Sequence, residues 1–444
     1  MVLDMKSLVC IVAFVSCLFT SRTALPQMLN CGFEAELINL QTSGNSLINA
    51  GDKDGDGNLD LLVRHDEGIT LFENLNGDFL PVADVEVDNC LTFFFEDVDS
   101  DGMSDLVAGN PDGFAVYINL GSFIFGPPQQ FEISLPFFGK LPATYLEPVD
   151  FDGDGDVDIA AAIASSSSFL LFRNNGNGVF EDDEFVSNAS LSFVSFSFGD
   201  LDADGDQDFV YSHVDSSNSE VGIGVRFNDG NGNFSEPQVI PRPKTSIDES
   251  FGVKVVDLNN DGMVEIAHLS FNFSNGNTNC LNVIPNEGGG SFGSPLTYEL
   301  RRPTSSILVS DLNEDGLKDL VVCANSGVSL LFNSGDAEVF NDEEFYFGLT
   351  FRCSSAAAGD WDSDGDIDLA TANGPNAADD ISIFTKRGYL LGDIDQNGIV
   401  ELLDIAPFVE ILNEGGFQIE ADTNFDGAVS LTDVGPFVDL LIGN

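Results

Sequence analysis

The sequence has few basic residues, with 16 Lys and Arg against 74 Asp and Glu and a formal charge of −58. Nucleic acids and anionic membrane surfaces are bound through basic faces, so this balance argues against both as partners. Such a charge is usual for disordered chains. Here, however, 43% of the residues are hydrophobic and 39 are Phe, which is enough to build a core. The acidic residues must therefore have local roles within a folded protein.

Histidine and tryptophan are also scarce, with three His (His65, His213 and His268) and the single Trp361. No Ser-His-Asp order, nucleophile elbow or phosphate-binding loop accompanies them. His65 and His213 each lie five residues after a repeated acidic motif, which indicates strand ends or surface positions rather than catalysis. Trp361 alone offers little aromatic surface for stacking on a sugar. We therefore assign no catalytic residue.

Cysteine is too sparse and too irregular for a metal site, because no two cysteines are spaced as Cys-x-x-Cys. Five remain after an N-terminal signal is removed, which permits two disulfides and one free thiol, or buried strand cysteines without bonds. The pairing stays open among Cys31, Cys90, Cys280, Cys323 and Cys353.

Long hydrophobic runs are missing beyond the N-terminus. Residues 1–24 contain Lys6, an apolar run over 8–19 and then small polar residues, which is typical of a secretory signal. The run is too short to cross a bilayer core of about 30 Å. We expect a secreted, extracellular protein, with attachment to a cell surface as the alternative. A lipid-modified Cys17 is poorly matched by the residues before it, and the cleavage site stays open.

A nine-residue acidic motif, D-x-D/N-x-D-G-x-x-D/E, recurs seven times at intervals of 45 to 57 residues. A hydrophobic stretch precedes each copy, and an apolar run follows it. A third strand then ends near an Asn, before a Gly/Asn turn and a Phe. Several short strand runs in each period, without a helix, predict four-stranded antiparallel units. A period near 50 residues fits a propeller blade, so we expect an all-β seven-bladed β-propeller over residues 31–390.

The two ends of the repeat region predict how the ring closes. The last repeat stops after its third strand, at residues 381–386, where the composition changes. An extra strand-like segment, residues 33–40, precedes the first repeat. We infer that this N-terminal strand completes blade seven, which removes open sheet edges.

The motif has the donors of a calcium site. Calcium takes six to eight oxygens, and positions 1, 3, 5 and 9 offer side-chain oxygens while position 7 offers its backbone carbonyl. A glycine at position 6 permits the positive φ that folds the loop around an ion. The expected ligands, loop by loop, are Asp52, Asp54, Asp56, Asn58 and Asp60; Asp97, Asp99, Asp101, Met103 and Asp105; Asp150, Asp152, Asp154, Asp156 and Asp158; Asp200, Asp202, Asp204, Asp206 and Asp208; Asp257, Asn259, Asp261, Met263 and Glu265; Asp311, Asn313, Asp315, Leu317 and Asp319; Asp360, Asp362, Asp364, Asp366 and Asp368.

These seven copies resemble FG-GAP/VCBS repeats, the repeats of integrin α-chain heads and of many exported bacterial proteins. The resemblance covers roughly residues 33–389 and implies a calcium-binding propeller. Loops five and six depart from the pattern with Asn259 and Asn313 at position 3, and loop five ends in Glu265. Without cations the crowded carboxylates would repel one another. The alternative is that the Asp residues only form turns, which does not account for seven aligned copies.

From residue 391 the repeat changes to two copies of a loop followed by an amphipathic helix, over 392–412 and 421–441. Both loops have side chains at EF-hand positions, with Asp in place of Glu at the twelfth. Their expected ligands are Asp393, Asp395, Asn397, Ile399 through its carbonyl, and Asp404; then Asp422, Asn424, Asp426, Ala428 through its carbonyl, and Asp433. With the blades, this makes about nine calcium sites.

Residues 391–444 resemble a type I dockerin, the module that attaches secreted polysaccharide-degrading proteins to cohesins. The resemblance implies a small α-helical EF-hand-like domain and a cohesin-like partner. Leu402-Leu403 and Leu431-Thr432 stand where dockerins usually have Ser-Thr, so another receptor, or docking on the propeller itself, is the alternative. We expect a non-catalytic binding or adhesion module with a carbohydrate or protein ligand. The rival is a carbohydrate-active enzyme, a glycoside hydrolase or polysaccharide lyase in polysaccharide breakdown.

Overall fold

The structure is a computed structural model, and every structural statement below concerns the residues that it describes. These are residues 23–24, 33–38, 47–53, 56–121, 124–135, 139–163, 168–187, 191–215, 220–240, 248–272, 278–300, 304–324, 327–335, 340, 344–347, 353–373, 381–386, 405–414 and 434.

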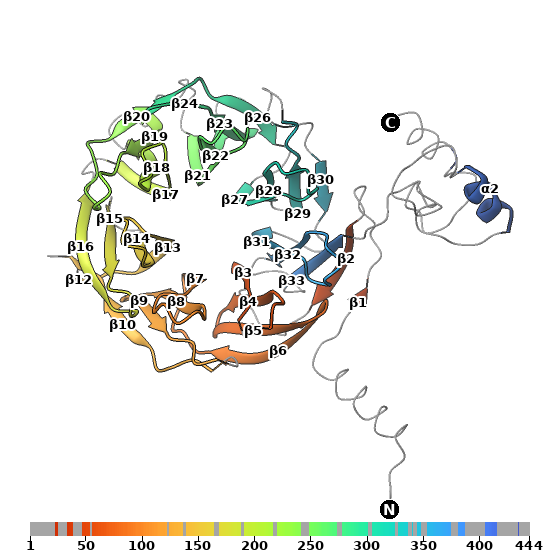
Figure 1. Ribbon diagram of the computed structural model, residues 1–444, viewed down its shortest axis with the longest axis horizontal. Coiled ribbons are helices and arrows are strands. Elements are labelled where there is room, and N and C mark those ends of the chain that lie inside the picture. The colour runs from red at the N-terminus through yellow and green to blue at the C-terminus, as the bar shows by residue number, and fades with distance from the viewer. Residues whose placement is uncertain are drawn as a thin grey trace, which may run out of the picture.

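Seven antiparallel sheets stand around a common axis and form a closed ring, as Figure 1 shows. Blade 1 comprises β3 (Leu47–Gly51), β4 (Asp60–His65), β5 (Gly68–Leu75) and β6 (Asp78–Val85). Blade 2 comprises β7 (Thr92–Glu96), β8 (Asp105–Asn110), β9 (Gly113–Tyr117) and β10 (Gln129–Glu132). Blade 3 comprises β13 (Ala143–Val149), β14 (Asp158–Ile163), β15 (Ser168–Asn174) and β16 (Phe180–Ser187). Blade 4 comprises β17 (Leu191–Gly199), β18 (Asp208–Asp215), β19 (Glu220–Arg226) and β20 (Gln238–Ile240).

The remaining blades follow the same order. Blade 5 comprises β21 (Asp248–Val256), β22 (Glu265–Asn272), β23 (Thr278–Ile284) and β26 (Leu296–Leu300). Blade 6 comprises β27 (Thr304–Ser310), β28 (Asp319–Ala324), β29 (Gly327–Leu331) and β30 (Glu344–Phe347). Blade 7 contains β31 (Cys353–Gly359), β32 (Asp368–Asn373) and β33 (Ile381–Lys386). Two short hairpins lie outside the blades, β11 (Ser134–Leu135) with β12 (Gly139–Lys140), and β24 (Asn286–Gly288) with β25 (Ser291–Phe292).

Blade 7 is completed from the N-terminus. β2 (Phe33–Ile38) pairs antiparallel with β33 over its whole length, from Phe33 opposite Lys386 to Ile38 opposite Ile381. β1 (Thr23–Ala24) adds two further pairs at the outer edge. The predicted closure is therefore confirmed, because a strand from before blade 1 is hydrogen-bonded within blade 7 to the last strand of the repeat region.

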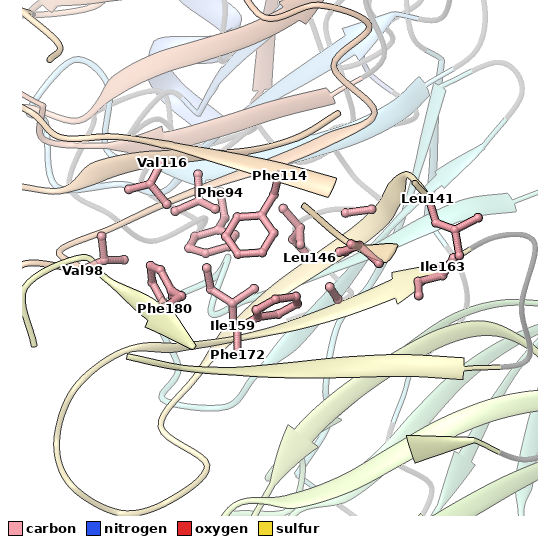
Figure 2. Packing of buried hydrophobic residues seen from close by; sticks show 14 residues of the cluster. Phe94, Val98, Phe114, Val116, Leu141, Leu146, Ile159, Ile163, Phe172 and Phe180 are labelled. Carbon is pink, nitrogen blue, oxygen red and sulfur yellow. The ribbon is translucent and has the colours of Figure 1, made fainter. Parts of the chain in front are cut away.

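The hydrophobic core is divided among the junctions between blades. Each of seven buried clusters combines side chains from two neighbouring blades, and together they cover all seven junctions. Figure 2 shows the junction of blades 2 and 3, where the Phe114 and Phe172 rings meet edge to face with centroids 4.9 Å apart. Burying one such side chain contributes about 1.5–3 kcal/mol. The many Phe residues thus hold neighbouring sheets together.

A disulfide reinforces one junction. It joins Cys323 in β28 of blade 6 to Cys353, the first residue of β31 in blade 7. Cys90 and Cys280 are buried and lie outside the disulfide, and burial raises the pKa of Cys90 to about 11. That pKa leaves Cys90 protonated and unreactive near neutral pH. Cys31 lies outside the described residues.

The helix expected after Asp404 is α2 (Ile405–Glu414), with Pro407 in its first turn. Phe408 is buried, whereas Ile405 and Val409 are exposed. The loop ligands of the C-terminal repeat lie outside the described residues, as does the second helix apart from Val434. The structure therefore does not test the EF-hand-like domain. Within the described chain, no helix is long and apolar enough to cross a membrane.

Candidate metal centres

Each acidic motif forms the connection between the first and second strands of its blade. Position 9 is the first residue of the second strand, at Asp60, Asp105, Asp158, Asp208, Glu265, Asp319 and Asp368. Because the same connection is used in every blade, all seven loops lie on the same face of the ring. Figure 1 shows the radial arrangement, with the first strands nearest the axis.

The loops share one hydrogen-bonded turn. In each, the position 1 carboxylate accepts the backbone N–H of the position 6 glycine at 2.8–3.1 Å. The glycine φ angles lie between +86° and +99°. A Cβ at any of these glycines would meet nothing within 4 Å, so the backbone conformation, and not space, requires glycine there. These glycines are Gly57, Gly102, Gly155, Gly205, Gly262, Gly316 and Gly365.

Position 4 has the same left-handed backbone, although its residue type varies. The φ angle is between +55° and +74° in the six loops where the residue is described. These residues are Ser100, Gly153, Ala203, Asn260, Glu314 and Ser363. Five of the six are not glycine, so this second bend leaves no signal in the motif. The shared conformation shows that the loops are one structure repeated.

The position 9 carboxylate is buried and holds the loop against the blade. One of its oxygens accepts the N–H of position 2, at 2.8–3.2 Å. Burial raises the pKa of this carboxyl, to about 6 at Asp105 and Asp208 and about 7 at Asp158 and Asp368, although the backbone N–H donors oppose the rise. A nearby cation would favour the ionised form.

Side-chain oxygens converge in the loops. In loops 2, 3, 4 and 7, three carboxylates each place an oxygen within 4.8 Å of the other two. Four loop carboxylate oxygens are buried without a hydrogen-bond donor among the described residues, namely Oδ1 of Asp202, Asp257, Asp311 and Asp362. A buried anionic oxygen without a donor is costly. A hard cation would satisfy it, so the donor set fits such an ion.

Loops 1, 5 and 6 differ in detail. In loop 1, Asp54 lies outside the described residues. In loops 5 and 6, the position 3 amide oxygens of Asn259 and Asn313 accept the N–H of position 5 at 2.9 and 3.2 Å. Convergence of three carboxylates is thus shown in loops 2, 3, 4 and 7, and the full ligand sets of the seven blade loops stay predictions. The structure does not describe the ten C-terminal ligands, Asp393, Asp395, Asn397, Ile399, Asp404, Asp422, Asn424, Asp426, Ala428 and Asp433.

A buried asparagine joins each of six blades to the blade before it. Its Nδ2 donates to the position 2 carbonyl of the preceding blade's loop, at 2.5–3.2 Å, and its Oδ1 accepts an N–H of the following turn. These bridging residues are Asn74, Asn119, Asn174, Asn228, Asn286 and Asn333. The recurrent Asn at the end of the third strand was visible in the sequence, but its role was not, because its partner lies in another blade.

Blade 7 has Lys386 where the other blades have the bridging asparagine. Its Nζ donates to the Leu312 carbonyl at 3.1 Å, and its backbone N–H donates to Asp368 at 2.6 Å. The fourth strand of this blade is β2, from the N-terminus, so no turn to a fourth strand follows Lys386. An amide oxygen that caps such a turn is therefore not needed. The longer side chain of Lys386, which can only donate, makes the bond to the preceding blade.

Three of the four residues considered for catalysis or sugar stacking are buried, namely His65, His268 and Trp361. His65 ends β4, which is one of the two expected positions, and its side chain is buried: Nε2 lies 3.0 Å from Thr70 Oγ1, and Nδ1 accepts the N–H of Glu67. His268 and Trp361 are completely buried. The His213 side chain lies outside the described residues. Trp361 therefore offers no face to a sugar.

Comparisons with known proteins agree with this geometry. The model of the FG-GAP-like repeat matches residues 97–161, 150–211 and 311–371. No curated protein matches the chain. A structure of an Agrocybe aegerita lectin that recognises non-reducing terminal N-acetylglucosamine has a TM-score of 0.51 and 17% identity, covering 80% of this chain and 95% of the lectin. A BBS1N structure in complex with ARL6DN has a TM-score of 0.53 and 11% identity, covering 79% of this chain and 94% of BBS1N. The chain thus contains FG-GAP-like repeats, and its described residues fold as a seven-bladed β-propeller.

Proposed function

We propose that this chain is an exported, calcium-binding propeller that acts as a non-catalytic binding or adhesion module for a carbohydrate or protein ligand. Calcium binding is supported chiefly by the repeated loop: oxygens converge in four of the seven loops, and four buried carboxylate oxygens have no donor among the described residues. Calcium suits such loops because it accepts six to eight oxygens in flexible geometry, whereas magnesium demands a tight octahedron. The ions would stiffen the turns and have no chemical step to perform.

Two features support a binding role. Ligand sites in propellers are built by loops on a rigid frame. Of the two similar structures, one is named for recognising a sugar and the other is a complex with a protein. The rival, a polysaccharide-degrading enzyme, draws no support from His65, His268 or Trp361, which are buried.

Export and attachment complete the proposal. Residues 1–24 supply the secretory signal, and residues 391–444 form a dockerin-like module with two further calcium loops that binds a cohesin-like partner. The acidic surface, with a formal charge of −58, suits an extracellular medium rich in calcium. Elemental analysis of dialysed protein should return about nine calcium ions. Two or fewer would contradict the blade sites.

Glycan arrays test the binding role directly. The calcium-loaded protein is applied with and without EGTA, and every bound glycan is then incubated with the protein in an assay for reducing and unsaturated ends. Binding that requires calcium and releases no product supports the proposal. Release of either kind of end would show an enzyme and overturn the non-catalytic reading.

A further inference from the structure

We propose that the seven metal loops are coupled around the ring, so that a cation bound in one loop raises the affinity of the loop next to it. This inference rests on the proposed calcium sites, and it adds that binding at one site regulates the affinity of the next. It is carried by a hydrogen-bonded circuit that runs through every loop and every junction between blades.

In each blade the circuit involves the position 2 residue, the position 9 carboxylate and the bridging residue. The position 2 residue donates its N–H to the position 9 carboxylate of its own loop, and its carbonyl accepts the side-chain N–H of the next blade's bridging residue. In loop 7, for example, Trp361 donates to Asp368 at 2.9 Å and accepts from Asn74 at 2.9 Å. Asn74 then donates its own N–H to Asp60, the position 9 carboxylate of loop 1, at 2.9 Å.

The same step recurs at all seven junctions. The backbone N–H of each bridging residue donates to the position 9 carboxylate of its own blade, at 2.6–2.9 Å in blades 1, 2, 3, 4, 6 and 7. Lys386 makes the step from blade 7 to loop 6, through the Leu312 carbonyl. No junction is left open, so the circuit closes on itself.

The circuit gives a physical route for coupling. An ion that orders one loop fixes its position 2 and position 9 groups, and these hold the bridging side chain of the next blade. The neighbouring loop then loses less conformational freedom when it binds its own ion, which produces positive cooperativity. Couplings of this kind typically change affinity by about fivefold or more.

Trp361 provides a reporter for a single loop. It is the one tryptophan in the chain, it occupies position 2 of loop 7, and its ring packs against Phe79 of blade 1 with centroids 5.8 Å apart. Its fluorescence during a calcium titration, or terbium luminescence sensitised by its indole, reports binding at loop 7. The perturbation is made in loop 1 by D52N/D56N. The matched control is D200N/D204N, the same positions in loop 4 of blade 4, which shares no junction with blade 7.

We expect D52N/D56N to lower the affinity of loop 7 for the ion by about fivefold or more. D200N/D204N should change that affinity by less than twofold. In an Asn74→Ala background, which removes the side-chain link to Trp361, D52N/D56N should lose its effect on loop 7. Circular dichroism checks that each variant folds, and the single substitution D56N replaces the pair if the pair does not.

The outcomes separate the two proposals. If elemental analysis finds no metal and terbium gives no luminescence, the proposed calcium sites are wrong. Metal binding at loop 7 that is unchanged by loop 1 substitutions, or changed equally by loop 1 and loop 4 substitutions, would overturn the coupling and leave the calcium sites standing.

Discussion

Arg173 in β15 forms an ion pair with Asp152, the position 3 residue of loop 3. The Asp152 side chain is only 6% exposed, and the guanidinium also lies over the Phe151 ring and donates to the Asn231 carbonyl of blade 4 at 3.3 Å. Arg173 directly precedes a bridging asparagine. The residues at this place in the other blades are all non-basic: Glu73, Ile118, Phe227, Pro285, Phe332 and Thr385. Loop 3 therefore has a built-in cation on one of its expected ligands.

We expect loop 3 to bind calcium more weakly than its five acidic residues suggest. An ion entering this loop must displace Arg173 or bind beside its positive charge. Arg173→Gln should therefore raise the calcium affinity of loop 3 by about tenfold or more, given Coulomb energies between such charges. Calorimetric titration at low free calcium measures the change as an additional tight site.

The matched control is Arg226→Gln in blade 4, whose guanidinium donates to the Ser235 carbonyl at 2.9 Å. It should leave the number of tight sites unchanged. Identical titrations for Arg173→Gln and the parent protein would show that the ion pair does not compete with calcium. In loops 5 and 6, Asn259 and Asn313 replace a carboxylate, and fewer ligand charges should lower their calcium affinity as well.

The pairing of β2 with β33 predicts that the N-terminal strand is needed for the propeller. A variant that begins at residue 45 lacks β2 and exposes the edge of β33, and an open strand edge promotes aggregation. We expect aggregation in light scattering or a clearly lower melting temperature. A variant that ends after residue 390 is the control, and its propeller should melt as in the full chain. A monomeric N-terminal truncation with an unchanged melting temperature would contradict the closure role.

The bridging asparagines predict a measurable contribution to stability. Asn228 donates to the Phe151 carbonyl at 2.7 Å and accepts the N–H of Gly232 at 3.1 Å, and it is buried. Asn228→Ala leaves buried polar groups without partners, which should cost about 2 kcal/mol or more of unfolding free energy. Denaturant unfolding in constant excess calcium measures the loss.

Asn231→Ala is the matched control, in the same turn. The Asn231 side chain bonds locally, through Nδ2 to the Asp229 carbonyl at 3.1 Å, and its N–H donates to the Asp229 carboxylate, on the exposed surface. Its backbone carbonyl, which accepts from Arg173, is kept in the substitution. This substitution should cost no more than about 0.5 kcal/mol. Equal losses of unfolding free energy in the two variants would mean that the hydrogen bond between blades does not add to stability.

Local patterns predicted much of the structure, because each is confined to one hairpin. The motif places its acids, its glycine and its strands within a few residues of one another, so the loops and the blade count could be read directly. The closure could also be inferred, because the seventh repeat lacks a strand that residues 33–40 could supply.

Contacts between blades could not be read in this way. Asn74 and its partner Trp361 are 287 residues apart, and nothing local to either names the other. The pairing of Cys323 with Cys353 depends likewise on which strands face each other across a junction. The burial of His65 and Trp361 follows from that same packing, and neither the spacing of His65 from its motif nor the type of residue 361 could show it.

The last prediction concerns removal of the proposed ions. Nine calcium ions would bring eighteen positive charges to a chain with a formal charge of −58, and would place them beside the carboxylates that repel most. The unfolded chain lacks these sites, so each ion stabilises the folded state by about 2.7 kcal/mol at a hundredfold excess over its Kd. Several sites together exceed the usual unfolding free energy of about 5–15 kcal/mol. EGTA at low ionic strength should therefore lower the melting temperature by tens of degrees or unfold the propeller.

Sodium chloride distinguishes a bound ion from general charge repulsion. Salt screens repulsion between exposed charges, but it supplies no divalent cation to the buried oxygens of Asp202, Asp257, Asp311 and Asp362. Melting curves in EGTA with added NaCl should thus recover only part of the loss, whereas excess calcium should restore it fully. Superimposable curves in EGTA and in calcium would mean that the loops are acidic turns held by their own hydrogen bonds. Full recovery by NaCl alone would assign the effect to charge density, because a screened chain would then need no ion within the loops.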